Sequence, residues 1–239
     1  MVSVQKWIAL LSEQVGRGIY VWSGNGQALD RMTDPEAWIE KRETSEENAA
    51  RAVSLYRIRK AAGIAPIRAF DCSGLMHWGL KSLHILERDV SSRTLYAKCT
   101  PLSGESELTA GDFVFRHDGK RIVHVGAYVG SGRVIECAGR DVGVVSGKLR
   151  KGYWNRFGRL EGAFSDDDAK ASPHVRIKGK SVRIRSGGST AFPTVQIAHA
   201  GEAYPLLGAA ETGWYRIDLG ARDGFVTNRS RYTEVTYNA

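Results

Sequence analysis

The segment Asp71-Cys72-Ser73-Gly74-Leu75 carries a cysteine at the predicted start of a helix. Apolar residues follow it at helical spacing, which indicates a helix that is buried along one side. The N–H groups of a first helical turn have no partner within the helix and point toward a side chain at that position. Such groups, together with a nearby imidazolium, can lower the pKa of a thiol from about 8.5 to roughly 3.5 to 7.5. Cys72 is therefore predicted to be an activated nucleophile, and the same N–H groups are candidates for an oxyanion hole.

One histidine further along the chain, His124, lies in a stretch whose apolar residues recur at every second position. This period predicts a β-strand with two distinct faces. Val123 and Val125 are expected to face the core, while His124 and Gly126 face the other side. Gly126 leaves space beside the imidazole for a helix end or a substrate. Cys72 and His124 together provide the thiol and the base that thiolate catalysis needs, which favours a cysteine hydrolase.

A third group must hold the imidazole in one tautomer and one orientation, as a carboxylate does in hydrolase triads. Glu136 is the candidate for this role. If residues 130–132 form a three-residue hairpin loop, Val129 pairs with Arg133 and Glu136 lies on the same face as His124. A two-residue loop would place the two side chains on opposite faces. We predict the three-residue loop; the alternative is that Glu136 is an ordinary glutamate on a solvated strand face.

The composition of the chain argues against several classes of protein. Its 239 residues are 42% apolar, which is enough for an ordinary core, and no apolar run is long enough for a membrane span or a signal peptide. Three cysteines without a CxxC pair or a Cys/His cluster indicate neither a disulfide framework nor a metal site, so Cys99 and Cys137 are predicted to be structural. The net charge of +8 suggests an anionic partner, but no nucleic-acid motif accompanies it, and we expect no nucleic-acid binding.

The pattern of the first two thirds of the chain predicts an α+β domain over residues 1–164. Helices are expected over residues 3–15 and twice within residues 34–62, where capping sequences occur at residues 33–36 and 44–47. After the helix of Cys72, short runs of period two predict an antiparallel sheet against which the helices pack.

The last third of the chain has a different pattern. Residues 165–173 are small and charged, so they are predicted to form a linker. Over residues 174–239, short alternating runs between glycine-rich turns predict a small all-β barrel. Basic residues gather in its first strands, which makes negatively charged surfaces plausible targets for it.

The motifs also match a known family. Besides residues 71–75, the match rests on Leu108-Thr109-Ala110-Gly111-Asp112-Phe113-Val114-Phe115 and on His124-Val125-Gly126-Ala127-Tyr128-Val129-Gly130-Ser131-Gly132-Arg133-Val134-Ile135. In order and spacing these stretches resemble the NlpC-type cell-wall peptidases, a papain-like group that hydrolyses the peptide stems of bacterial peptidoglycan. The resemblance covers most of residues 3–164, and Tyr20-Val21-Trp22-Ser23-Gly24 is similar to the family's aromatic and glycine segment.

The resemblance implies a role for each residue of the site. Cys72 would be the nucleophile, His124 the general base and later the acid, and Glu136 the orienting residue. The residues implied to line the site or bind substrate are Tyr20, Asp71, Ser73 and Gly74. The resemblance implies no metal and no organic cofactor.

Three features depart from the family's pattern. The third catalytic position is more often a histidine than a glutamate such as Glu136, and Ser23 replaces a frequent glycine. The helical stretch of residues 30–68 is longer than in minimal members and could reshape the substrate groove.

Residues 174–237 resemble the bacterial SH3-like domains that accompany such peptidases. The resemblance is clearest in Val182-Arg183-Ile184-Arg185-Ser186-Gly187, Gly213-Trp214-Tyr215-Arg216-Ile217 and Gly224-Phe225-Val226. It implies a cell-wall-binding module, in which Trp214 and Tyr215 either contact the ligand or belong to the core and rim of the barrel.

Three functions follow from these patterns. The first is a peptidoglycan endopeptidase that cuts a stem-peptide amide, by family analogy the bond from D-glutamate to the diamino acid, through a thioacyl intermediate. The second is an N-acetylmuramoyl-L-alanine amidase or an acyl transferase with the same Cys/His site. The third is a wall-binding protein without activity. Synthesis in the cytoplasm without a visible signal peptide, together with a target in the wall, suggests a phage or prophage lysin or a mature secreted enzyme.

Overall fold

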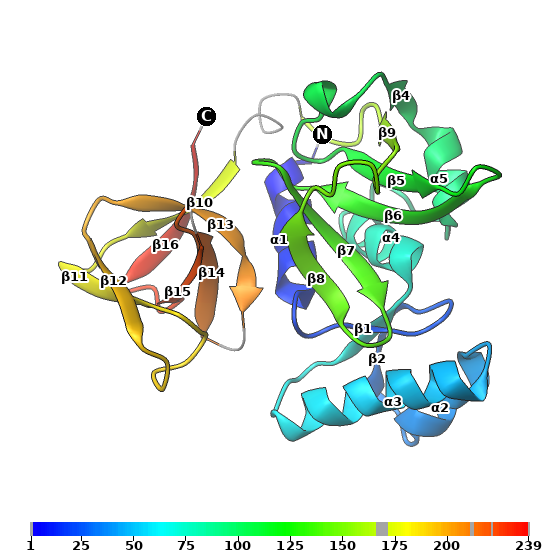
Figure 1. Cartoon of the computed structure of the whole chain (residues 1–239), viewed down its shortest axis with the longest axis horizontal. Helices are drawn as coiled ribbons and strands as arrows, with labels where there is room; N and C mark the ends of the chain where they lie inside the picture. The colour runs from blue at the N-terminus through cyan, green and yellow to red at the C-terminus, as the bar shows by residue number, and fades with distance from the viewer. Residues whose placement is uncertain (1, 166–171, 211–212, 221, 239) are drawn as a thin grey trace. The chain divides into compact units, whose positions relative to one another are not determined.

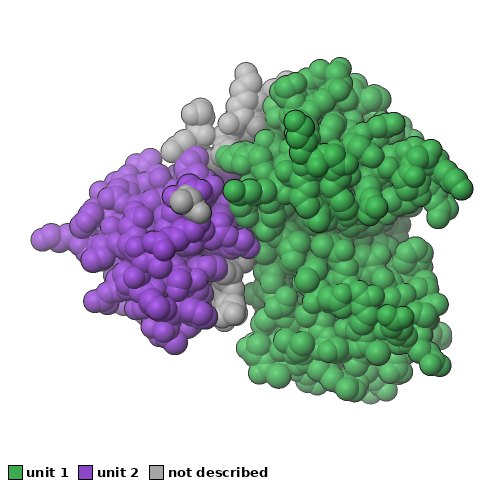
Figure 2. All heavy atoms as spheres, viewed as in Figure 1, with its two compact units in different colours: residues 1–169 green, residues 170–239 purple. Residues whose placement is uncertain are grey.

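The computed structural model describes residues 2–165, 172–210, 213–220 and 222–238 of the chain. The chain divides into two compact units, Met1–Ala169 and Lys170–Ala239, which are coloured separately in Figure 2. Most of the predicted linker, residues 165–173, lies outside the described residues.

A six-stranded antiparallel sheet forms the centre of the first unit (Figure 1), and its strand order is β4-β9-β5-β6-β7-β8. The strands are β4 (Thr100–Leu102), β5 (Phe113–His117), β6 (Ile122–Tyr128), β7 (Arg133–Gly139), β8 (Gly143–Lys148) and β9 (Arg156–Arg159). The predicted combination of helices with an antiparallel sheet is confirmed.

One face of this sheet is covered by helices α1 (Val4–Gln14), α4 (Cys72–Ser82) and α5 (Ser92–Lys98). The prediction of a helix over residues 3–15 is confirmed, and Ser3 caps it by accepting the N–H of Gln5. The buried face of α1 packs with α4 and the sheet in one core, where each fully buried large side chain contributes about 1.5 to 3 kcal/mol. No helix among the described residues is both long and apolar enough for a membrane span.

Two further helices, α2 (Pro35–Arg42) and α3 (Glu46–Ala61), begin at the predicted capping sequences. Asp34 caps α2 by accepting the N–H of Ala37, and Ser45 caps α3 by accepting the N–H of Asn48. They share a second core with a small sheet that the sequence did not predict. Its strands are β1 (Ile19–Tyr20), β2 (Asn25–Ala28) and β3 (Arg68–Phe70), with β3 in the middle.

Strand β6 departs from strict alternation at one point. Val125 is fully buried in the core under the helices, as predicted, but Val123 is 37% exposed. The pairing of β5 with β6 shifts register between Arg116 and His117, so β6 carries an extra residue here. The predicted core position of Val123 is therefore wrong, because a bulge interrupts the alternation of faces.

The second unit consists of seven strands in the order β12-β11-β15-β14-β13-β10-β16. They are β10 (Ser172–Ile177), β11 (Ser181–Arg185), β12 (Thr194–His199), β13 (Ala203–Ala210), β14 (Trp214–Asp218), β15 (Asp223–Thr227) and β16 (Thr233–Asn238). Their inward residues form a separate apolar core. The predicted short strands are present, but the described strands do not hydrogen-bond into a closed barrel.

The contact between α1 and α4 can be tested at Gly79. A Cβ at this position would lie 2.6 Å from Nε1 of the buried Trp7. We expect Gly79→Ala to lower the free energy of unfolding by about 1 to 2 kcal/mol, because overpacking outweighs the helix preference of alanine. Chemical denaturation measures this change. Gly104→Ala, at an extended residue with open space around it, is the control and should change stability by less than about 0.5 kcal/mol. An unchanged or raised stability for Gly79→Ala would contradict the close approach.

Candidate functional site

Asp71 fixes the start of α4. Its Oδ1 accepts the N–H of Gly74 at 2.6 Å and the hydroxyl of Ser73 at 3.0 Å. A Cβ at Gly74 would lie 1.9 Å from the carbonyl oxygen of Gly24, so only glycine permits this backbone contact. Asp71 and Gly74 therefore build the turn that carries Cys72. The N–H of Gly74 is bound to Asp71, which removes it from the predicted oxyanion hole.

Cys72 is the first residue of α4, as predicted, and only 9% of it is exposed. Burial raises the pKa of its thiol to about 12, and the negative charge of Asp71 adds to this effect. The backbone N–H groups of Val125, Ser73 and Cys72 itself act in the opposite direction but are weaker. The predicted lowering of the pKa is therefore wrong for the free protein, because the helix position of a residue does not reveal its depth of burial.

His124 and Glu136 come together on one face of the β6–β7 hairpin. Nε2 of His124 lies 2.7 Å from Oε2 of Glu136, and both side chains are buried. The N–H of Val129 donates to the carbonyl of Arg133 at 3.0 Å, which confirms the three-residue loop over residues 130–132. The parity of the hairpin thus places the two side chains as the sequence predicted.

Three residues that the sequence analysis did not identify surround this pair. Nη2 of Arg150 donates to Oε1 of Glu136 at 2.7 Å, so each carboxylate oxygen has a partner. The ring of Trp154 is stacked on His124 with centroids 5.4 Å apart and planes 14° apart. The Arg150 guanidinium lies 3.8 Å over the ring of Tyr153. A buried glutamate requires a cation in its vicinity, but no spacing in the sequence indicates which arginine supplies it.

The space beside the imidazole is not open to a substrate. A Cβ at Gly126 would lie 2.6 Å from Val134 and 3.2 Å from Trp154. The prediction that Gly126 makes room for a helix end or a substrate is therefore wrong. The missing side chain makes room for the indole ring that packs on His124.

Cys72, at the start of α4, lies beside β6 next to the position of His124. The N–H of Val125, the residue after His124, lies close enough to Cys72 to affect its pKa. Strands β6 and β7 pair only near their hairpin end, at Ala127 with Ile135 and at Tyr128 with Val134. Among the described residues no hydrogen bond joins the Cys72 thiol to the imidazole, and Nδ1 of His124 has no hydrogen-bond partner.

A groove of about 770 Å³ runs over the start of α4, and Cys72 lies in its wall together with Tyr20, Trp22 and Ser73. Burial raises the pKa of the Tyr20 hydroxyl, and the neighbouring Cys72 and Asp71 raise it further. The hydroxyl therefore stays protonated and can donate a hydrogen bond. Trp22 is 49% exposed, which makes it one of the large apolar side chains most open to solvent.

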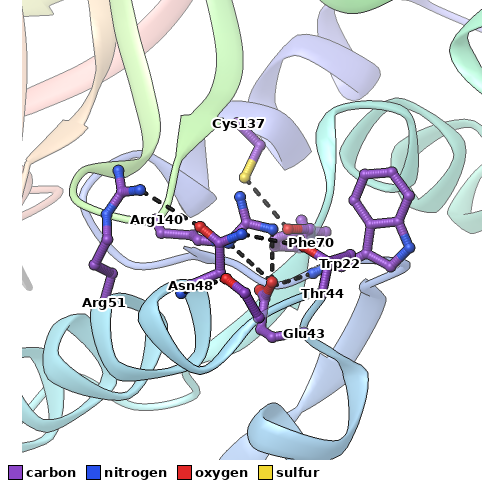
Figure 3. Close-up of polar contacts among 9 residues, drawn as sticks. Trp22, Glu43, Thr44, Asn48, Arg51, Phe70, Cys137 and Arg140 are labelled. Atoms are coloured by element: carbon purple, nitrogen blue, oxygen red, sulfur yellow. Dashed lines mark hydrogen bonds and ion pairs between the residues drawn. The ribbon is translucent and has the colours of Figure 1, made fainter.

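Glu43, the residue that follows α2, supports the wall of this groove at Trp22, and its polar contacts are drawn in Figure 3. Glu43, whose side chain is fully buried, accepts Nη2 of Arg140 at 2.6 Å and the backbone N–H of Trp22 at 3.1 Å. The Arg140 guanidinium also lies 4.8 Å over the ring of Tyr20. The end of α2 thus positions the aromatic segment of the groove.

The other two cysteines lie away from solvent. Sγ of Cys137 is 3.5 Å from the carbonyl oxygen of Phe70 (Figure 3), and Sγ of Cys99 is 3.2 Å from that of Leu95. Burial is the main cause that raises the pKa of both thiols. No group of three or more His, Cys, Asp or Glu residues within the described ranges is arranged to hold a metal ion.

Residues 58–159 match the model of the NlpC/P60 family. The bifunctional muramidase/DL-endopeptidase CwlT of Bacillus subtilis is 38% identical over 107 residues, which are 41% of this chain and 31% of that protein. The murein DD-endopeptidase MepH of Escherichia coli is 35% identical over 100 residues, which are 39% of this chain and 36% of that protein. The chain thus spans about a third of the length of these two curated relatives.

Among solved structures, the P60 domain of an antigen from M. avium subspecies paratuberculosis is similar to this chain. It has 23% sequence identity and a TM-score of 0.44, and the similarity covers 66% of this chain and 93% of that domain.

The buried ion pair of Glu43 and Arg140 generates a prediction about stability. Replacing Arg140 with Met leaves the Glu43 carboxylate buried without its cation, which should cost about 3 to 5 kcal/mol of unfolding free energy. The control is Arg57→Met, at an ion pair with Glu36 whose side chains are 66% and 34% exposed, where we expect a much smaller loss of stability. Equal losses in urea denaturation would contradict a special role of the buried pair.

The raised pKa of Cys72 predicts its reactivity. Since the thiolate fraction grows about tenfold per pH unit below the pKa, alkylation of Cys72 by iodoacetamide should still accelerate between pH 7 and pH 9.5. Mass spectrometry of the alkylated peptide separates Cys72 from Cys99 and Cys137. A rate that reaches its plateau below pH 7 would mean that the free protein already holds a thiolate.

Proposed function

We propose that this chain is a cysteine endopeptidase that hydrolyses amide bonds in the peptide stems of bacterial peptidoglycan. The observation that carries the proposal is a cysteine at a helix start, in the wall of a groove, beside a strand whose histidine is bonded to a buried carboxylate. The NlpC/P60 match and the endopeptidase names of CwlT and MepH support it.

In the proposed mechanism, Glu136 accepts the Nε2–H of His124 and so leaves Nδ1 as the base. Nδ1 takes the proton of the Cys72 thiol, and the sulfur attacks the carbonyl carbon of the stem-peptide amide. The imidazolium then gives this proton to the departing amine, and a thioester joins Cys72 to the acyl fragment. Water, deprotonated by His124, attacks the thioester and releases the acid and the free thiol.

The negative charge that develops on the carbonyl oxygen requires hydrogen-bond donors. Since the N–H of Gly74 is bound to Asp71, we assign this role to the N–H of Cys72, assisted by the hydroxyl of Tyr20. The raised pKa of Tyr20 keeps that hydroxyl protonated and therefore able to donate. Asp71 and Ser73 act by shaping the turn.

The bond that we propose is the one from D-glutamate to the diamino acid. The DL-endopeptidase name of CwlT favours this choice, whereas the name of MepH describes a DD-endopeptidase. The same Cys/His site also suits an N-acetylmuramoyl-L-alanine amidase or an acyl transferase, which would differ in the ends that they produce. For the second unit we propose an SH3-like wall-binding module, supported by its seven short strands around a compact apolar core.

A digest of purified peptidoglycan, analysed by mass spectrometry, tests the activity and the bond together. We expect new amino ends on the diamino acid and new carboxyl ends on D-glutamate. The Cys72→Ala variant should release no fragments, while the control Cys99→Ala, at a buried thiol outside the groove, should keep most of the activity. Fragments released equally by Cys72→Ala would refute the proposed nucleophile, and new glycan ends at N-acetylmuramic acid would favour the amidase.

The role of Glu136 predicts a separate kinetic effect. Glu136→Gln keeps the shape of the side chain but removes the charge that orients His124 and stabilises its protonated form. We expect kcat to fall on the order of a hundredfold with little change in KM. A wild-type kcat in a variant that unfolds at the same temperature as the native protein would exclude Glu136 from the catalytic group.

A further inference from the structure

The second unit contains a groove of its own, with a volume of about 760 Å³. Strands β11 and β12 line one side of this groove. Gly213, Trp214 and the loop from β15 to β16 line the other side. All of these residues belong to one unit. The NlpC/P60 match ends at residue 159 and so does not include this groove.

Four guanidinium groups line this groove. Arg183 and Arg185 come from β11, while Arg229 and Arg231 come from the loop between β15 and β16. No aspartate or glutamate lines the groove within the described ranges, and none of the four arginines forms an ion pair there. Arg185 donates to the carbonyl of Phe192, and this contact leaves its charge unbalanced. The groove therefore carries a local excess of positive charge.

The same groove offers apolar surface between the arginines. Trp214 and Tyr232 line it, and so does Ile197, which is 54% exposed. The Arg231 guanidinium lies 4.4 Å over the ring of Tyr232. Aromatic and apolar faces of this kind pack well against the C–H groups of a polyol or a sugar ring. A ligand that alternates anionic groups with a neutral carbon backbone would match both features of the groove.

We propose that this groove, the arginine groove, binds a linear polymer with repeating phosphodiester groups on a polyol or sugar backbone. A guanidinium binds two oxygens of one phosphate in a fork, and each phosphodiester keeps one negative charge at any physiological pH. Because exposed ion pairs are individually weak, several contacts along one chain are needed for stable binding. The inference that this polymer comes from the cell wall rests on the proposed function. The choice of a phosphodiester as the anion rests only on the residues of the groove.

The test measures binding of the full chain to a defined oligomer of glycerol phosphate at several salt concentrations. We expect Arg183→Gln to weaken binding about threefold and Arg183→Gln with Arg229→Gln about tenfold. The slope of log affinity against log salt should fall by roughly 0.7 for each arginine removed, as for a flexible single-stranded polyanion. The matched control is Arg176→Gln, an exposed arginine of β10 outside the groove, which should change affinity less than about twofold.

Three outcomes would overturn the proposal. An equal loss of affinity in Arg176→Gln would mean that net charge alone attracts the polymer. Equal binding of a uronic acid polymer would show that carboxylates serve as well as phosphates. Tighter binding of single-stranded DNA with the same number of phosphates would point to nucleic acid.

Two further measurements keep this test separate from the proposed function and from misfolding. Thermal unfolding should be unchanged in the Arg183 and Arg229 variants, since both side chains are exposed. Hydrolysis of a soluble muropeptide should also be unchanged in them. If the wild-type chain fails to hydrolyse the muropeptide, the proposed peptidase activity fails while the result on the arginine groove still holds.

Discussion

The close approach of two backbones at Gly24 and Gly74 is the constraint on which the site depends. The Gly24 carbonyl accepts the N–H of Asp71 at 2.8 Å, and the same oxygen occupies the space that a Cβ on Gly74 would need. This contact holds the aromatic segment that includes Tyr20 against the start of α4. The helix start, Cys72 and one wall of the groove are thereby fixed in a single turn.

The opposite side of the site depends on the balance of charge around Glu136. A buried carboxylate is costly unless each oxygen has a partner, and here one oxygen bonds to His124 and the other to Arg150. Trp154, stacked on the imidazole, restricts its rotation from the side where Gly126 leaves room. The Glu136 carboxylate is therefore tolerated at this buried position, because the chain also supplies the Arg150 cation.

The sequence predicted those parts of the structure that depend on local rules. The caps at Asp34 and Ser45 follow from the preferences of helix starts, and the facing of His124 and Glu136 follows from the parity of one hairpin. The bulge that exposes Val123 has no local signal in the sequence.

Several of the contacts that were missed join residues far apart in the chain. Arg140 lies 97 residues from Glu43, and the Arg51–Asp141 pair spans 90 residues. The burial that raises the pKa of Cys72 has the same origin, since it comes from packing among separate elements. Hydrophobic periodicity and motif spacing within a single sequence do not indicate which distant residues form such pairs.

The raised pKa of Cys72 is compatible with nucleophilic catalysis, because the proton does not have to leave the site. In the proposed mechanism the proton moves to His124, the thiolate and the imidazolium appear together, and the sum of charges over Cys72, His124, Glu136 and Arg150 stays the same. The Glu136 carboxylate stabilises the imidazolium, while the N–H of Val125 stabilises the sulfur. Burial therefore opposes a lone thiolate more strongly than it opposes this pair. In such a site, formation of the nucleophile is coupled to the base, and the thiol stays protonated until His124 can accept its proton.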